Sequence, residues 1–262
     1  MLDTEIIRQN IAPEWRDVWT LQVVEETRST NDSVLELATK LPFRALFAEQ
    51  QTQGRGRRGN DWFSGAPGEN LMLSCAYHCP WPLHHWSRLT HVMALSVKRT
   101  LDDLPPAQPK VKWPNDIFLG HRKVAGILIE TKVTADRSPP LAVIGLGINV
   151  NSDIESMPEA IANTATSLLE VTGTIIDRNV LAATLLTQFN AALNEAEDHF
   201  ADQLDELRQA AYLTDKQIRA RTPNGGVVSG RAEGLGNEGE LLLRRDDGSI
   251  DSITSAEEVR TI

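Results

Sequence analysis

One six-residue loop restricts the fold more than any other part of this sequence: Gly54-Arg55-Gly56-Arg57-Arg58-Gly59. Its spacing matches the G-x-G-x-x-G pattern, which in dinucleotide-binding folds opens directly into a helix whose N-terminus faces pyrophosphate. Here the glycines lead into residues 60–65 and then a predicted strand, so that fold is not indicated. A P-loop would end in Gly-Lys-Ser/Thr, and a kinase loop would be followed by H-R-D and D-F-G motifs. The sequence contains neither.

The loop instead has the composition of an anion-binding turn between two strands. Glycines let backbone amides approach a ligand closely, and guanidinium groups hold carboxylate or phosphate oxygens in pairs. The formal net charge is -10, from 26 basic and 36 acidic side chains. Three arginines within six residues of such an acidic chain favour an anion site over a solvated basic turn. Trp62, just after the loop, either stacks on a planar ligand or anchors the loop.

The composition restricts the class of protein. With 262 residues, the chain can form one large core and a small second domain. Its acidic charge disfavours nucleic acid, so DNA is not an expected partner. We expect no membrane partner and a cytoplasmic location, because no apolar run approaches the ~20 residues of a spanning helix and no signal peptide is evident. Cys75 and Cys79 are expected to be ordinary buried thiols.

Periodicity and turn signals predict an α+β domain. Helices are expected from a cap among residues 29–32 up to Pro42, over residues 83–104, and in two or three segments between residues 157 and 212, with Asp177 as a cap. The buried face of the second helix is predicted to carry Trp86, Leu89, Val92, Met93, Val97 and Leu101. Strands are expected over residues 43–49, 71–77, 110–113 with 117–119, 123–133 and 141–150.

The texture changes after residue 216. Five short β-like runs, at residues 217–221, 227–231, 240–244, 249–254 and 259–262, are separated by Gly- and Asn/Asp-rich turns. Such closely spaced strands predict a small barrel. We therefore expect two domains, 1–213 and 214–262.

The strand at residues 141–150 has one nearly bare face. Ile144, Leu146 and Ile148 alternate with Gly145 and Gly147, and Asn149 follows on the glycine side. Two glycines weaken a strand by roughly 0.5–1 kcal/mol each relative to alanine, which suggests that something lies flat against them. A nucleotide would fit, and so would close packing of a helix.

Two lysines lie near this strand along the chain. Lys112 precedes Trp113-Pro114-Asn115-Asp116, and Lys123 begins the next strand, in which Gly126 again leaves space. If these strands form a hairpin, both lysines can converge on one polyanion, with Asn115 or Asp116 positioning Mg²⁺. Each lysine alone could equally be a solvated surface charge.

In this order, the segments resemble the biotin protein ligase family. The blocks that match are Ser29-Thr30-Asn31, Gln51 with residues 54–59, Trp62-Phe63-Ser64, residues 112–116, Lys123-Val124-Ala125-Gly126-Ile127-Leu128 and Gly145-Leu146-Gly147-Ile148-Asn149. The resemblance covers about residues 28–151, and the C-terminal segment fits the family's SH3-like barrel more loosely. It implies a catalytic domain related to class II aminoacyl-tRNA synthetases, with a mixed, mostly antiparallel sheet flanked by helices.

The resemblance also implies an activity. Biotin and ATP, with Mg²⁺, would give biotinyl-5'-AMP and pyrophosphate, and a lysine of a biotin carboxyl carrier domain of a biotin-dependent carboxylase would then take the biotin. Many bacterial relatives carry an N-terminal DNA-binding domain. The roughly 25 residues before the first matching block are expected to be too few for one, which indicates the monofunctional type; a homodimer stays open.

The resemblance assigns roles to residues. The biotin pocket would be formed by Ser29, Thr30, Asn31, Gln51, Gly54, Arg55, Gly56, Arg57, Lys123 and Gly126. The ATP side would be formed by Trp62, Lys112, Asn115, Asp116, Gly145, Gly147 and Asn149. Lys123 and Arg57 are the expected catalytic cations, since an anion attacking a phosphate needs fixed positive charge. Asp116 is expected to position Mg²⁺ and is the candidate base for the incoming lysine.

Two alternatives remain open from the sequence. A ligase of the same fold could activate lipoate or octanoate, although the polar set at residues 29–31 and 51 suits a ureido ring better than an acyl chain. A regulator could bind biotin without turnover, but the acidic charge argues against DNA binding.

Overall fold

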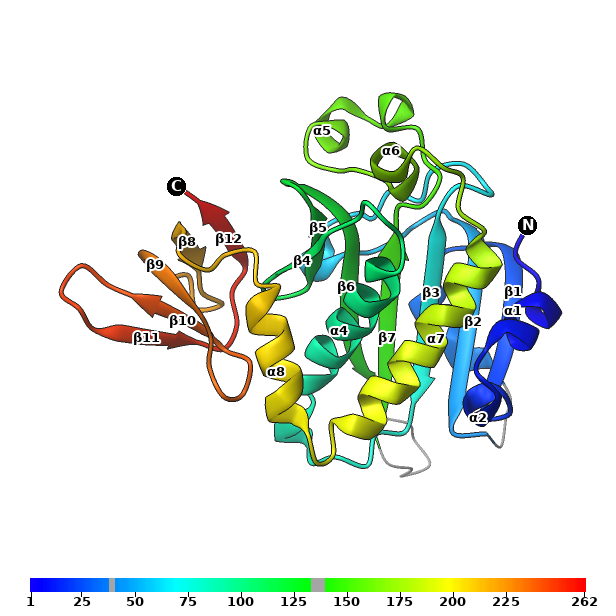
Figure 1. The fold of residues 1–262 in the computed structure, drawn as a ribbon, viewed down its shortest axis with the longest axis horizontal. Coiled ribbons are helices and arrows are strands. Elements are labelled where there is room, and N and C mark those ends of the chain that lie inside the picture. The colour runs from blue at the N-terminus through cyan, green and yellow to red at the C-terminus, as the bar shows by residue number, and fades with distance from the viewer. Residues whose placement is uncertain (38–40, 133–139) are drawn as a thin grey trace.

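The structure is a computed structural model that describes residues 1–37, 41–132 and 140–262. Its main part is a seven-stranded sheet in the order β1-β2-β3-β7-β6-β5-β4 (Figure 1). The strands are β1 Trp19–Thr27, β2 Phe43–Gln51, β3 Leu71–Tyr77, β4 Pro109–Lys112, β5 Asp116–Leu119, β6 Arg122–Lys132 and β7 Leu141–Ile148. β1 and β2 are parallel and every other neighbouring pair is antiparallel, which confirms the mixed, mostly antiparallel sheet.

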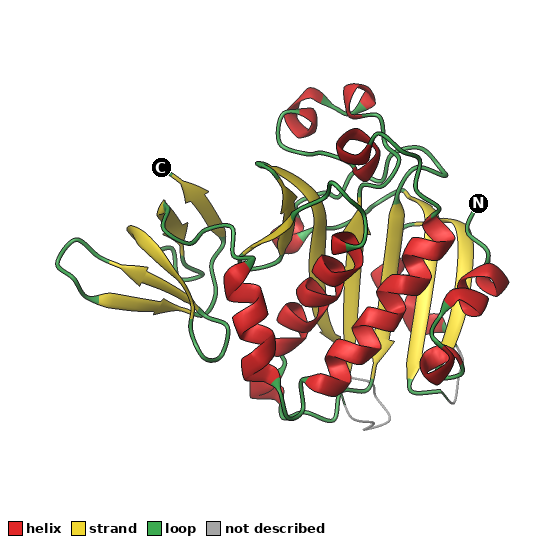
Figure 2. Cartoon of the chain, in the orientation of Figure 1, coloured by secondary structure: helices red, strands yellow, loops and turns green. Residues whose placement is uncertain are grey.

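Helices cover one face of this sheet (Figures 1 and 2). They are α1 Thr4–Asn10, α4 Arg88–Asp102, α7 Arg178–Glu195 and α8 Phe200–Gln209. All six residues predicted for the buried face of this helix are buried, although Trp86 lies just before the start of α4. Asp177 caps α7 as predicted, because its carboxylate accepts hydrogen bonds from the amides of Asn179 and Val180.

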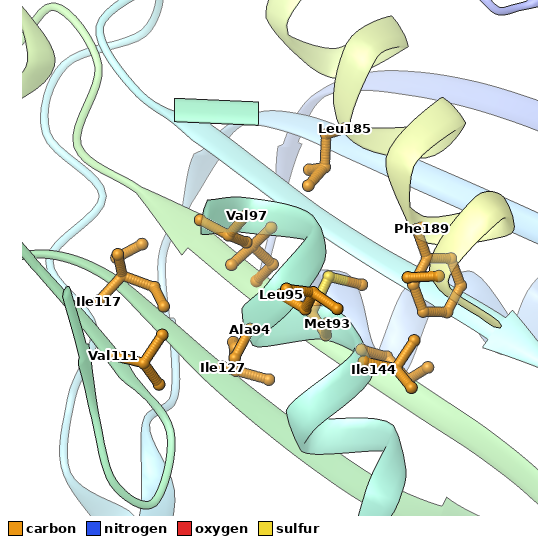
Figure 3. Close-up of a cluster of buried hydrophobic side chains, with 14 of the residues drawn as sticks. Met93, Ala94, Leu95, Val97, Val111, Ile117, Ile127, Ile144, Leu185 and Phe189 are labelled. Atoms are coloured by element: carbon orange, nitrogen blue, oxygen red, sulfur yellow. The ribbon is translucent and has the colours of Figure 1, made fainter. Parts of the chain in front are cut away.

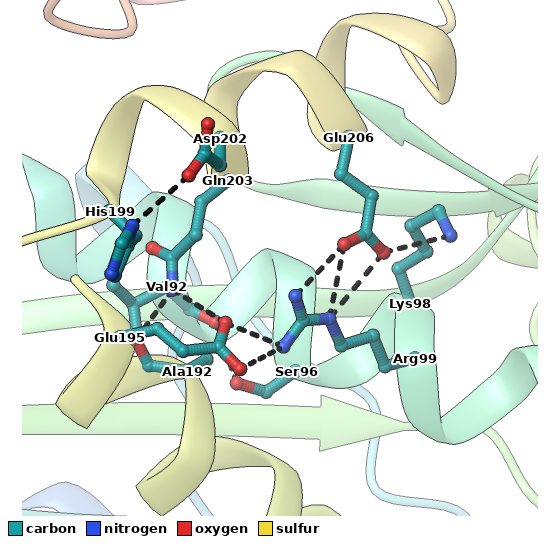
Figure 4. Close-up of polar contacts among 10 residues, drawn as sticks. All are labelled: Val92, Ser96, Lys98, Arg99, Ala192, Glu195, His199, Asp202, Gln203 and Glu206. Atoms are coloured by element: carbon teal, nitrogen blue, oxygen red, sulfur yellow. Dashed lines mark hydrogen bonds and ion pairs between the residues drawn. The ribbon is translucent and has the colours of Figure 1, made fainter.

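The apolar side chains of these helices and of the sheet form the main core (Figure 3). Met93 and Val97 of α4, Phe189 of α7 and Ile144 of β7 are completely buried in it. The helices also hold one another through charge (Figure 4). Arg99 of α4 pairs with Glu195 of α7 and Glu206 of α8, at 2.9 Å in each case. The helical layer is therefore fixed to the sheet by packing and to itself by ion pairs.

The opposite face of the sheet carries a smaller layer. α3 Thr30–Ser33 and the 3-10 turn Val34–Glu36 pack there, where Val34 meets Leu46 and Val143 in a second small cluster. The predicted cap is confirmed, because Ser29 is the N-cap of α3, but the helical residues end at Glu36 rather than at Pro42. The helix begins at Thr30 and the chain is extended at Leu37, while residues 38–40 lie outside the described part. Gln51 fixes the position at which α3 begins, because its side chain accepts a hydrogen bond from the Thr30 amide at 2.9 Å.

Most other predicted strands are confirmed to within a few residues. The helix α1, the short helix α2 Pro13–Arg16 and the edge strand β1 were not predicted from the sequence. In β1 only Trp19 is buried, and the other residues are half-buried or exposed without the alternation of a half-buried strand. Short helices, α5 Glu159–Ala162 and α6 Leu168–Thr172, cap the end of the sheet near the β5–β6 turn (Figure 1).

The C-terminal part is a separate antiparallel sheet in the order β11-β10-β9-β8-β12, as the SH3-like prediction requires. Its strands are β8 Gln217–Arg221, β9 Val227–Leu235, β10 Leu241–Arg244, β11 Ile250–Ile253 and β12 Glu258–Thr261. It lies against the α8 end of the main domain (Figure 1). Two side chains of the main domain contact the carbonyl oxygen of Gly239, which lies between β9 and β10. Trp113 Nε1 donates to it at 3.1 Å, and His91 Nε2 lies 2.9 Å from it.

One buried ion pair joins β2 to α7. Glu49 of β2 is 1% exposed and pairs with Arg178 of α7 at 2.8 Å. The same carboxylate accepts from the amides of Leu2 and Gly68. Burial alone would raise the pKa of Glu49, but the hydrogen bonds from Arg178 and the Leu2 amide hold it below its ordinary value. The pair therefore fixes the chain's first residues and the turn at Gly68.

The thiols of Cys75 and Cys79 are both free and buried. Burial raises the pKa of each thiol. Within residues 1–37, 41–132 and 140–262, no helix is long and apolar enough to cross a membrane, and no group of three or more His, Cys, Asp or Glu side chains could hold a metal ion.

Candidate active site

The floor of the candidate site is made by the glycines of β6 and β7. Gly126 and Gly147 are paired across the two strands, and Gly145 lies two residues along on the same face. A methyl group at Gly147 would lie 2.3 Å from the Trp62 ring, and one at Gly145 would lie 2.3 Å from Asn31 Oδ1. The bare face predicted from the sequence exists, and in this structure a tryptophan and an amide from the α3 layer lie on it.

One end of the floor is polar, and its side chains are hydrogen-bonded to one another. The Thr30 amide and hydroxyl both donate to Gln51 Oε1, at 2.9 and 3.1 Å. The buried hydroxyl of Ser74, on β3, lies 2.7 Å from Thr30 Oγ1 and 2.6 Å from Asn31 Oδ1. Asn31 Nδ2 donates to Glu130 at 2.6 Å. These groups are therefore held in fixed orientations before any ligand arrives.

The other end carries the cations. Lys123 Nζ lies 2.7 Å from Asp116 Oδ1 and 5.5 Å from the centre of the Trp62 ring. Asp116 Oδ1 is buried, and this ion pair gives it no hydrogen bond of good geometry. Arg57 Nη1 donates to Asn115 Oδ1 at 3.3 Å. Burial and the neighbouring Arg58 charge lower the pKa of Arg57, but an arginine of this kind stays protonated.

Lys112 lies on the hairpin predicted for it but faces a different neighbour. β4 and β5 pair with Lys112 opposite Asp116. The Lys112 ammonium lies 5.0 Å from the centre of the Phe118 ring. Burial lowers the pKa of Lys112, and the carboxylate of Asp116 partly opposes that shift. The nearby charge of Lys123 adds to the lowering of the Lys112 pKa, so an added polyanion would favour the charged form of Lys112.

A cavity of about 50 Å³ lies between the floor and the loop. Thirteen of the predicted site residues line it: Ser29, Thr30, Asn31, Gln51, Arg55, Gly56, Arg57, Trp62, Asn115, Lys123, Gly126, Gly145 and Gly147. Ligand cavities are typically ~300 Å³ or larger, so the loop or Trp62 must move for a ligand to enter. A groove of about 580 Å³ shares Arg57, Asn115, Ile127 and Leu128 with the cavity and opens toward the C-terminal sheet.

Four predicted residues lie outside the cavity lining. Gly54 lines a neighbouring surface groove, and Asp116 is next to two lining residues, through its ion pair with Lys123 and its strand pairing with Gly126. Lys112 lies behind Asp116, at the Phe118 ring. Asn149 is turned away, since its Nδ2 donates to the carbonyl of Thr166 at 2.9 Å.

Sequence reasoning missed two polar residues of the site. Ser74 is the one serine or threonine in β3, a strand whose seven residues are all buried. A buried hydroxyl among apolar neighbours must find partners, and that signal could have identified it. Glu130 carries no comparable local signal, because its partners are Asn31, 99 residues away, and Arg55, 75 residues away.

These features define a class of protein. The main domain is of the class II aminoacyl-tRNA synthetase type, with a cavity that is polar at one end and cationic at the other, and an SH3-like sheet follows it.

Comparison with known proteins agrees with this class. Residues 21–149 match the model of the biotin/lipoate A/B protein ligase family, and residues 214–257 match the biotin protein ligase C terminal domain. A bifunctional ligase/repressor BirA of Bacillus subtilis is 34% identical over 98% of this chain and 75% of its own length. A biotin–[acetyl-CoA-carboxylase] ligase of Mycobacterium tuberculosis is 31% identical over 94% of this chain and 89% of its own.

A solved structure is similar over nearly the whole chain. The biotin protein ligase from Aquifex aeolicus in complex with biotin and ATP has a TM-score of 0.81 and 29% identity, over 93% of this chain and 99% of that one. This chain belongs to the biotin/lipoate A/B protein ligase family.

Proposed function

We propose that this chain is an ATP-dependent biotin ligase that adenylates biotin and transfers it to a lysine of a biotin carboxyl carrier domain. The observation that carries the proposal is the cavity itself, which joins a hydrogen-bonding end to a cationic end across a glycine floor. Biotin has the same polarity, with a ureido ring at one end and a carboxylate at the other. Relatives named as biotin–[acetyl-CoA-carboxylase] ligases support the choice of a carboxylase carrier as acceptor.

The polar end is suited to a ureido ring. A ureido group offers two N–H donors and one carbonyl acceptor, and it needs both kinds of partner once it is buried. Ser29, Thr30 and Gln51 supply hydroxyl and amide groups that can donate and accept, and all three line the cavity. A lipoyl or octanoyl chain offers this end neither donors nor acceptors, and covering a polar group that it cannot satisfy costs ~1–3 kcal/mol. We therefore prefer biotin to those acids.

The cationic end is suited to the first reaction step. The biotin carboxylate attacks the α-phosphorus of ATP, a C–O–P bond forms, and the bond to pyrophosphate breaks. Two anions approach each other, so fixed positive charge must offset the charge that gathers on the phosphoryl oxygens. Lys123 and Arg57 flank the cavity there. Lys112, Trp62, Asn115, Gly145, Gly147 and Asn149 remain proposed for the ATP side.

Asp116 fits Mg²⁺ as one protein ligand. Its Oδ1 is buried without a hydrogen bond, and Mg²⁺ in nucleotide sites is usually held by one or two carboxylates together with phosphate oxygens and water. The bound ion would neutralise phosphate charge. Without a nucleotide, the ammonium of Lys123 takes that place at 2.7 Å.

The second step transfers the biotinyl group. The neutral amine of the carrier lysine attacks the acyl carbon, an amide bond forms, and AMP leaves with the electrons of the broken C–O bond. The amine proton must be accepted, and we assign that role to Asp116, which adjoins Lys123 at the cavity. The loop at residues 54–59 would exclude water from the labile mixed anhydride until the carrier arrives.

The remaining proposals concern organisation and setting. We place the domain boundary at residues 213 and 214, supported by the end of α8 at Gln209 and the start of β8 at Gln217. We propose that the protein works in the cytoplasm without DNA as a partner, supported by the net charge of -10 and by two thiols that are free. A homodimer is compatible with this chemistry.

The transfer assay tests the proposal. The protein is incubated with ATP, Mg²⁺, biotin and a purified biotin carboxyl carrier domain, and the carrier is examined by intact mass. We expect one added biotinyl group on the wild-type carrier and none on a carrier whose acceptor lysine is changed to arginine. An unmodified wild-type carrier, with the ligase shown to be folded, would contradict the proposal.

A further inference from the structure

Two of the three arginines in the loop at residues 54–59 are already paired with carboxylates of the protein. Arg55 lies 2.8 Å from Asp32 of α3 and 3.2 Å from Glu130 of β6. Arg58 forms an ion pair with Glu257, just before β12 of the C-terminal sheet. Arg57, between them, has no carboxylate within ion-pair distance among the residues that the structure describes. The loop is thus fixed on both sides, and only its central cation is available to an anionic ligand.

The backbone conformation at Arg58 also indicates that the ion pair of Arg58 holds the loop. Arg58 has φ 60° and ψ 35°, in the left-handed region, and Gly59 follows with φ 76°. A non-glycine residue there is unfavourable by roughly 1 kcal/mol, so a compensating contact must hold it. The turn sends the Arg58 side chain to Glu257 and the Arg57 side chain to Asn115. Glycine at position 58 would accept the turn more easily but could not form the ion pair.

The C-terminal segment touches the loop a second time. Arg57 Nη2 donates to the carbonyl of Ala256 at 3.4 Å, one residue before Glu257. Both contacts come from a part of the chain about 200 residues away from the loop, as the separation of 199 between Arg57 and Ala256 shows. The position of Arg57 over the cavity therefore depends on the C-terminal sheet.

We propose that Glu257 is a positioning residue of the ligase: through Arg58 it holds the loop closed, so that Arg57 stays over the cavity and the acyl-adenylate is retained. This inference rests on the proposed function and adds a role for the C-terminal sheet in it. Glu257 itself touches no substrate. Loss of its charge should release the adenylate faster and expose it to water, while the chemistry of its formation remains intact.

The expected effect is moderate and depends on salt. The Arg58 and Glu257 side chains are 31% and 36% exposed, so the pair is partly screened by solvent. Ion pairs of this kind change an equilibrium by about two- to five-fold. At ~1 M salt the Debye length falls to ~3 Å, and most of that difference should disappear. A contact that only stabilised the fold would show no such link between adenylate retention and salt.

The test compares Glu257→Gln with Glu233→Gln. Glu233 pairs with Arg244 within the same C-terminal sheet and lines neither the cavity nor the groove, so its variant is a matched control. Two rates are measured in each protein: trypsin cleavage at the loop arginines without ligand, and loss of preformed biotinyl-adenylate in a chase with unlabelled biotin. Arg58→Glu combined with Glu257→Arg is added to the chase, to restore the pair with reversed charge.

We expect Glu257→Gln to raise both rates about two- to five-fold at low salt, Glu233→Gln to leave both unchanged, and the reversed pair to recover at least part of the retention. Equal rates in Glu257→Gln and Glu233→Gln would overturn the proposal. If the wild type forms no adenylate, the proposed function fails instead. Cleavage of the ligand-free loop then still decides whether Glu257 holds it closed.

Discussion

Replacing Gly147 with alanine tests the glycine floor most sharply. The added methyl would lie 2.3 Å from Trp62 Cε2 and 2.4 Å from Cζ2, whereas ordinary contact begins at 3.4 Å. The ring must therefore move by about 1 Å. The ring also lies close over Gly126, where an added methyl would be 3.1 Å from its Cζ3, so it covers both of the paired glycines. We expect the ring to lift off this floor and into the space of the ligand.

The magnitude follows from that displacement. Overpacking of this kind costs about 1–3 kcal/mol, which for a chain of this size lowers the Tm by roughly 2–12 °C. Activity should fall further, since a ~1 Å displacement near a reacting group can cost ~100-fold. We therefore expect a folded Gly147→Ala enzyme whose biotin-dependent exchange of pyrophosphate into ATP is reduced about 100-fold.

A second substitution separates this cause from general damage. Trp62→Phe removes the ring atoms that meet the new methyl, so Gly147→Ala should do less harm in that background than in the wild type. The coupling between the two sites should reach ~0.5–3 kcal/mol in stability, since they are in contact. Additive effects, or exchange by Gly147→Ala within about three-fold of the wild type, would refute the proposed packing of Trp62 on the floor.

Three other substitutions or treatments follow from the structure. Lys123→Gln should lower pyrophosphate exchange by ~10²–10³-fold, because it removes a cation from the forming phosphoryl anion, while Tm changes little; exchange near the wild-type rate would exclude that role. Glu49→Gln should destabilise the protein by up to ~3 kcal/mol at pH 7, because Arg178 loses its buried partner. Since the pKa of Glu49 is lowered in the fold, its contribution is present above the ordinary carboxyl pKa and lost as the pH falls through the folded value. In urea unfolding the gap between the two proteins should therefore narrow below about pH 4; a constant gap would contradict this. Burial raises the pKa of the Cys75 and Cys79 thiols, so both should resist a thiol reagent at pH 8 until urea is added; rapid reaction of both in the folded protein would be inconsistent with their burial.

The sequence predicted those parts of the fold that depend on local patterns. The α4 face, the antiparallel strands and the C-terminal turns follow from periodicity and turn residues, and the structure confirms them. The bare face at Gly145 and Gly147 was also visible, because glycine at alternate strand positions has few structural causes. What lies on that face, Asn31 and Trp62, could not be derived from spacing alone.

Long-range contacts were beyond the reach of such patterns. Glu49 and Arg178 look like surface charges in the sequence, yet they form a buried pair. The sequence predicted an anion site with three arginines. Arg55 and Arg58 are paired with carboxylates of the protein, so Arg57 is the arginine of this loop that is available to an anionic ligand. Nothing near Arg58 in the sequence points to Glu257. β1 was missed because its burial lacks a period, and its pairing with β2 is parallel and non-local.

The central claim is that this cavity activates biotin. Its most direct test is the exchange of labelled pyrophosphate into ATP with Mg²⁺, measured separately with biotin, lipoate and octanoate. We predict exchange that requires biotin and is at most weakly supported by the other two acids. Exchange with lipoate or octanoate in preference to biotin, or none with any acid from a folded protein, would contradict the assignment of the polar end to a ureido ring.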